Sequence, residues 1–131
     1  MTGEAEHQPS SFDEDALRAC VYRLLARLLA SPPDEAALAV ARGLKGDGSS
    51  FGEALGTLAR VAAATNPAAA STEYHALFIG LGRGELVPYA SYYRTGFLND
   101  RPLAAVRGDL ARLGLARAVG CHEPEDHVAS L

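Results

Sequence analysis

The densest group of reactive side chains is Glu123-Pro124-Glu125-Asp126-His127, which places three carboxylates and one imidazole within five residues. Carboxylates hold guanidinium groups through parallel hydrogen bonds, and histidine adds a hydrogen bond or a charge that switches near neutral pH. The same run also suits a helix start, with proline in the first position and acids against the free N–H groups. The spacing therefore predicts either a guanidinium-binding patch or the first turn of a helix that continues through Val128 and Leu131.

A metal site is a further alternative for this segment, because Cys121 and His122 stand directly before it. Thiolate, imidazole and carboxylate groups are the ligands that zinc prefers. However, Cys121 and His122 are adjacent and the sequence has no second such cluster, whereas a structural zinc site normally uses four spaced ligands. A metal-binding module built on Cys121, His122 and His127 is therefore kept only as an alternative.

A glycine-rich segment, Gly80-Leu81-Gly82-Arg83-Gly84, has the composition of a phosphate-binding loop but not its pattern. It lacks the lysine and hydroxyl pair that ends a P-loop, and no predicted strand precedes it, as a dinucleotide-binding fold requires. A connector after a helix explains the segment better, with weak nucleotide contact as the alternative.

Three tyrosines, Tyr89, Tyr92 and Tyr93, stand close together in one short segment. Such rings pack at the edge of a helical core, or they line a groove that binds peptides, because tyrosine offers a rigid amphipathic surface. No nucleophile lies in a catalytic motif, since Ser91 lacks the neighbouring residues that would activate it. The sequence thus favours a binding protein over an enzyme.

The composition indicates that helices position these residues. Alanine and leucine supply 43 of the 131 residues, whereas valine and isoleucine supply only 8, which favours helices over a sheet. The net charge is −4 and no basic cluster is visible, which argues against a nucleic-acid binder. No apolar run reaches the length of a membrane span, and the polar start MTGEAEHQPSS lacks the pattern of a signal peptide, so we expect a cytoplasmic protein.

Apolar periodicity and helix-capping residues predict about six helices in one all-α bundle. The predicted helices cover residues 13–30, 34–45, 50–64, 67 to about 80, 91–98 and 100–113. Ser50 and Glu53 form a predicted capping box, and Gly114 is a predicted helix end. Cys20 lies in the apolar stripe of the first helix as a predicted core residue, and residues 1–11 are predicted to form a disordered head.

Three segments of the second half carry the features of one known family. Glu73-Tyr74-His75-Ala76-Leu77-Phe78-Ile79-Gly80 matches a Y-x-x-L-F-x-G element, and Val87-Pro88-Tyr89-Ala90-Ser91-Tyr92-Tyr93 matches a proline–aromatic–serine–tyrosine segment. The run from Glu123 to His127 matches an E-P-x-D-H signature. In this order and spacing the chain resembles the TorD/DmsD/NarJ family of redox-enzyme maturation chaperones. The resemblance is specific over residues 73–131 and extends as a pattern over residues 12–65.

This resemblance implies an all-helical cytoplasmic chaperone that is not an enzyme and carries no cofactor of its own. Such chaperones bind a molybdoenzyme precursor, often at its twin-arginine signal peptide, and hold it until the molybdenum cofactor is inserted. The client, for example a formate dehydrogenase or an S/N-oxide reductase, is bound at its signal peptide or at its mature catalytic subunit, and some clients, including formate dehydrogenases, lack a signal peptide. The positions that match the family's peptide-binding residues are Glu123, Pro124, Asp126 and His127, together with Tyr89, Ser91 and Tyr92. GTP binding, to which members have been linked, is an alternative function, with the glycines of 80–84 as its local feature.

The resemblance also implies a shortened bundle, because members of the family continue for several helices after the E-P-x-D-H signature. We therefore expect residues 12–131 to form a single helical chaperone domain without its C-terminal helices. Such a bundle leaves a core face exposed, and domain swapping in a homodimer would cover that face.

Overall fold

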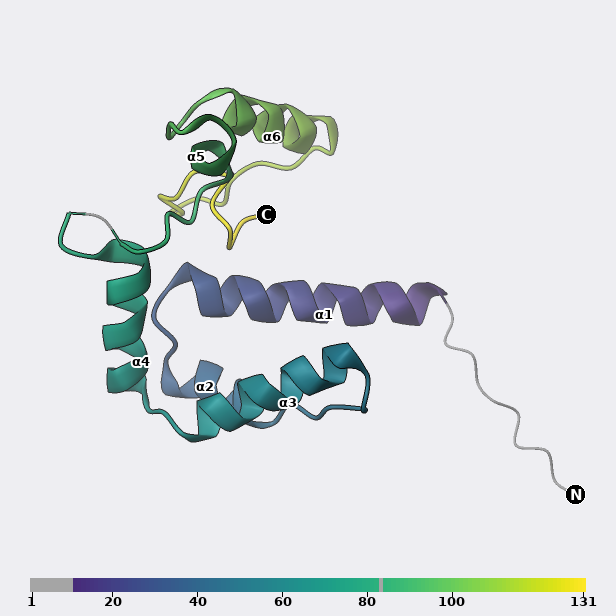
Figure 1. Ribbon diagram of the computed structural model, residues 1–131. Helices are drawn as coiled ribbons and strands as arrows, with labels where there is room; N and C mark the ends of the chain where they lie inside the picture. Colours follow the sequence, from purple (N-terminus) through teal and green to yellow (C-terminus); the bar gives the residue numbers. More distant parts are fainter. Residues whose placement is uncertain (1–10, 83) are drawn as a thin grey trace, which may run out of the picture.

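A computed structural model of the chain describes residues 11–82 and 84–131, and within these ranges it contains helices and no strands (Figure 1). The elements are α1 (Ser11–Ala30), α2 (Glu35–Arg42), α3 (Ser50–Ala63), α4 (Pro67–Tyr74), the π-helical turn η1 (His75–Ile79), α5 (Ala90–Thr95) and α6 (Arg101–Arg112). Six α-helices confirm the predicted all-α class. The predicted disordered head falls almost wholly outside the described ranges, and α1 begins at Ser11.

Side-chain caps explain where three of these helices begin. The side-chain oxygens of Asp34, Ser49 and Asn66 accept backbone N–H groups from the first turns of α2, α3 and α4, at 2.7, 3.0 and 3.0 Å. These bonds satisfy amides that have no partner inside the helix. The predicted capping box at Ser50 was wrong by one residue, because Ser49 has the extended backbone that a cap requires.

The best packed part of the molecule is the pair α2 and α3. Leu38 and Ala41 of α2 bury against Ala62 of α3, with Leu58 partly buried beside them. Arg42 ties the same two helices together, because its Nε donates to the carbonyl of Ala62 at 2.9 Å. The alanine-rich sequence supplies small residues at this contact, and these let the two helix backbones approach closely.

The final turns of helix α1 join it to α4 and to Asp34, the residue that caps α2. The Tyr74 hydroxyl of α4 donates to the Leu29 carbonyl at 2.9 Å, where α4 crosses the end of α1 (Figure 1). Further toward the N-terminus, Leu17 and Tyr22 are 65% and 61% exposed. Cys20 is exposed as well, so its prediction as a core residue was wrong. The apolar stripe is present, but the described part of the chain places no element over that portion of it.

The described residues of the glycine-rich segment form a loop, as predicted, and the chain then returns to η1. Gly84 lies against the end of η1, where an added Cβ would stand 2.5 Å from the Leu77 carbonyl oxygen. The next backbone contact follows at once, because the Leu86 N–H donates to the same Leu77 carbonyl at 2.7 Å. A residue without a side chain is therefore required for this close approach.

The last part of the chain differs from prediction. Gly114 ends α6 with a φ of 69°, as predicted for a left-handed helix end. The helix predicted from Pro124 is absent: residues 115–131 form turns, in which the His127 N–H donates to the Pro124 carbonyl at 3.0 Å. The Asp126 carbonyl and the Val128 N–H, which a helix would use for its internal hydrogen bonds, instead bond to residues 88–90. No helix in the described ranges is both long enough and apolar enough to cross a membrane.

Candidate functional site

Two of the three singled-out segments meet in a short antiparallel pairing. The Ala90 N–H donates to the Asp126 carbonyl at 3.0 Å, and the Val128 N–H donates to the Pro88 carbonyl at 2.8 Å. Tyr89 and His127 stand opposite each other in this pairing. The proline–aromatic segment and the acidic run, which are more than thirty residues apart in sequence, therefore form one structural unit. We call residues 88–91 and 123–128 the clasp.

Asp126 lies inside the clasp and not on its surface. Its side chain is 1% exposed, and its Oδ2 accepts the backbone N–H of Ser91 at 2.9 Å. Ser91 is fully buried. Within the described chain, Asp126 Oδ1 and the Ser91 hydroxyl have no hydrogen-bond partner. The carboxylate of Asp126, which the sequence analysis singled out for binding a guanidinium group, is therefore buried in this structure.

His127 is also buried, at 4% exposure, and it packs edge-on against Tyr89 with 5.1 Å between the ring centroids. Its Nδ1 accepts the Ala129 N–H at 3.1 Å, which leaves the proton of the neutral ring on Nε2. Burial lowers the pKa of His127 below its ordinary value, against the opposing effect of Glu123 and Asp126. The imidazole is therefore neutral near pH 7 and does not form part of an accessible patch.

Glu123 provides the exposed carboxylate of the clasp. The Tyr89 hydroxyl donates to its Oε2 and so fixes one oxygen while the residue stays exposed. Burial, followed by the neighbouring Glu123, raises the pKa of Tyr89 to about 12. Tyr89 therefore remains a hydrogen-bond donor at any pH near neutrality, and it holds the Glu123 carboxylate in a defined position.

Glu125 already has a guanidinium partner in this chain. Arg107 of α6 donates through Nε to Glu125 Oε2 at 2.9 Å, and the two side chains are 53% and 14% exposed. A hydrogen bond from its own backbone N–H, and then the nearby Arg107 and Arg117, lower the pKa of Glu125. One carboxylate of the acidic run, that of Glu125, therefore already binds a guanidinium group of the same chain.

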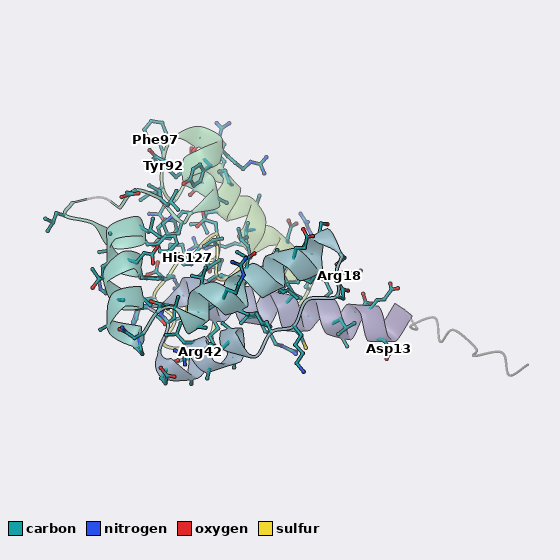
Figure 2. All side chains as sticks on the ribbon, turned by 60° about the horizontal axis from the view of Figure 1, so that its bottom comes forward. Asp13, Arg18, Arg42, Tyr92, Phe97 and His127 are labelled. Carbon is teal, nitrogen blue, oxygen red and sulfur yellow. The ribbon has the colours of Figure 1, made fainter. Side chains whose placement is uncertain are left out.

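The remaining predicted residues frame the clasp. Pro124 is half-buried and accepts the His127 N–H, while Tyr92 is half-buried with its ring edge-on to Tyr93 at 5.5 Å. Figure 2 shows Tyr92 and Phe97 at one end of the molecule and His127 nearer its middle. The clasp thus brings together six of the seven predicted site residues, with Tyr92 one helical position beyond Ser91.

An apolar groove of about 350 Å³ lies directly beside the clasp. Its walls are Leu29, Phe78, Leu86, Val87, Pro88, Tyr89, Ala90, Tyr93, Val128 and Leu131. The sequence singled out the tyrosines, but it gave no signal for Leu29 or Leu131, since isolated leucines have the same pattern in a core as in a groove. The clasp therefore forms one rim of an apolar groove and contributes Pro88, Tyr89, Ala90 and Val128 to its lining.

The other chemical alternatives gain no support from the geometry. Among the residues that the structure describes, no three His, Cys, Asp or Glu side chains gather as a metal site would require. In the glycine-rich loop, Leu81 is fully exposed and Gly82 has open space around it, while residue 83 lies outside the described ranges.

Comparison with known proteins places these features in a family. A family model described as the nitrate reductase delta subunit matches residues 45–131, which include both halves of the clasp. The chain belongs to the nitrate reductase delta subunit family. This family consists of maturation chaperones for redox molybdoenzymes and not of catalysts, which confirms the prediction that the protein is not an enzyme.

The fold has a counterpart among solved structures. A protein from Archaeoglobus fulgidus, described as a redox enzyme maturation protein, superposes with a TM-score of 0.62 at 22% sequence identity. The match covers 98% of this chain and 72% of that one. At this identity the comparison supports the fold. No curated protein matches the chain.

Proposed function

We propose that this chaperone binds the precursor of a molybdoenzyme at the clasp and the adjoining groove, and that the preferred ligand is a twin-arginine signal peptide. The observation that carries the proposal is the exposed carboxylate of Glu123, held by Tyr89 at the edge of an apolar groove. Planar guanidinium groups pair with carboxylates in two parallel hydrogen bonds, which ammonium groups cannot reproduce.

Each part of the site has a separate task in this proposal. Glu123 binds one guanidinium of the arginine pair, and Tyr89 and Tyr92 supply aromatic surface beside it. The groove receives apolar side chains that neighbour the arginines, because a concave apolar surface with few polar groups is the usual form of a ligand site. The frame beneath these contacts consists of the half-buried Pro124 and the buried side chains of Ser91, Asp126 and His127.

Binding of this kind supports the assembly of the client enzyme. A chaperone that covers the signal peptide of a precursor delays export while the molybdenum cofactor is inserted, so we infer that it acts in the cytoplasm. A client without such a peptide would offer its mature catalytic subunit to the same groove. We further propose assignment to the TorD/DmsD type within the wider family, and a homodimer as a second state of the chain.

Calorimetry with a synthetic twin-arginine signal peptide tests the proposal, with a peptide carrying two lysines in place of the arginines. We expect selective binding of the arginine peptide and a loss of about tenfold or more in Glu123→Gln, because the mutant loses a charge-assisted hydrogen bond. Glu53→Gln, an exposed glutamate on α3 remote from the clasp, is the matched control and should bind normally. Equal binding of both peptides, or normal binding by Glu123→Gln, would contradict the proposal.

A further inference from the structure

We propose that Asp126 is a positioning residue, whose carboxylate acts as a hydrogen-bond acceptor inside the clasp and whose negative charge is not read by the ligand. The inference rests on the proposed peptide site for its binding consequences, and on the clasp alone for its structural ones. It assigns different roles to Glu123 and Asp126, which carry the same carboxylate group and lie three positions apart in the sequence.

Burial excludes direct contact between Asp126 and a ligand. The side chain is 1% exposed, whereas Glu123 in the same run is exposed and Glu125 already pairs with Arg107. A guanidinium group could reach Asp126 only after the clasp had opened. Opening would break the two backbone hydrogen bonds that join residues 88–90 to residues 126–128.

The contacts of Asp126 show what it does instead. Its carbonyl accepts the Ala90 N–H at 3.0 Å, and its carboxylate accepts the next amide, Ser91 N–H, at 2.9 Å. Two successive amides at the start of α5 are therefore held by one residue. Tyr89 directly precedes them, and its hydroxyl positions Glu123. Asp126 thus fixes the backbone that aims the exposed carboxylate.

The unused oxygen of Asp126 supports a role as a hydrogen-bond acceptor, because the side chain accepts only the Ser91 N–H in the described structure. Oδ1 of Asp126 and the hydroxyl of Ser91 are both buried and lack partners in the described structure. A buried carboxylate oxygen without a donor is unfavourable, and an amide placed there would keep one acceptor for Ser91 N–H and add two donors. Asparagine therefore keeps the acceptor for Ser91 N–H without a charge to bury.

The test compares Asp126→Asn with Asp126→Ala in the full chain, using hydrogen exchange of the Ala90 and Ser91 amides and calorimetry with the twin-arginine peptide. In Asp126→Ala we expect the Ser91 amide to exchange about tenfold faster and the peptide to bind about tenfold more weakly, because the carboxylate that accepts the Ser91 N–H is lost, whereas the Ala90 N–H keeps its backbone acceptor. In Asp126→Asn both quantities should stay within about twofold of the wild type.

Two outcomes would overturn the inference. If Asp126→Asn keeps the protected amides but loses the peptide as Asp126→Ala does, the ligand reads the charge of Asp126. If Asp126→Asn accelerates exchange as much as Asp126→Ala does, the clasp requires the negative charge of Asp126 and not an acceptor alone. A wild-type chain that binds no peptide would reject the proposed function, but the exchange measurements on the two variants would still decide the role of Asp126.

Discussion

Replacing Tyr89 with phenylalanine removes the hydroxyl that donates to Glu123 while keeping the ring that packs on His127. The raised pKa of Tyr89, about 12 against an ordinary value of 10, means that folding favours the protonated phenol. This contribution is complete below pH 10 and is lost as the pH rises through about 12. At about 1.4 kcal/mol per pKa unit, the upper limit is about 2.7 kcal/mol. Burial, the largest cause of the shift, disfavours the ionised phenol without stabilising the protonated one, so Tyr89→Phe loses only the part that comes from the hydrogen bond to Glu123, about 1–2 kcal/mol.

Urea unfolding of the wild type and Tyr89→Phe at about pH 8 and about pH 11.5 measures this contribution. We expect Tyr89→Phe to be less stable by about 1–2 kcal/mol at the lower pH, and the difference to shrink at the higher pH. The absorbance of tyrosinate, followed against pH, should show a late titration that Tyr89→Phe lacks. Tyr22→Phe, at an exposed position on α1, is the control. A difference between wild type and Tyr89→Phe that is the same at both pH values would refute the reasoning.

Further predictions concern the core, the buried imidazole and the internal ion pair. Leu38→Ala should lower the free energy of unfolding in urea by about 2–4 kcal/mol, because Leu38 is buried between α2 and α3; a change below about 1 kcal/mol would disprove that packing. Lowering the pH below 6.5 should destabilise the wild type, because burial lowers the pKa of His127 and the imidazole therefore binds a proton more readily in the unfolded state. In acid titrations followed by circular dichroism, His127→Gln should reduce this pH dependence. Arg107→Gln should change stability by less than about 1 kcal/mol and raise peptide affinity up to about fivefold, because it frees Glu125 for the ligand; weaker binding in calorimetry would show that Arg107 supports the site.

Much of the helical framework follows from the sequence. Proline after Asn66 and glycine at position 114 act locally, so they predict a helix start and a helix end without knowledge of the fold. The same local reasoning failed at Pro124, because the backbone groups that would form a helix pair with residues 88–90, which a single-sequence pattern does not reveal. Capping signals are reliable where no distant segment competes for the same amides.

At the candidate site, too, the sequence predicts local features but not the pairing of distant segments. Sequence identified the acidic run and the tyrosine segment as separate features, and their resemblance to a family linked them. It did not distinguish Glu123, which is exposed, from Asp126, which is buried, because the two side chains carry the same group. Which carboxylate faces solvent depends on the pairing of two segments distant in the sequence. The exposure of Cys20, predicted to be buried, has the same origin, since apolar spacing defines a face but not whether another element covers it.

The central claim is that the clasp and its groove form the client-binding surface. Hydrogen exchange of the full chain, measured by mass spectrometry with and without the twin-arginine peptide, tests this claim most directly. If the peptide binds at the clasp and its groove, we expect slower exchange over residues 86–93 and 121–131 when peptide is bound, and unchanged exchange in α2 and α3. Peptide binding that protects α2 and α3, or any other region, while leaving the clasp unchanged would contradict it.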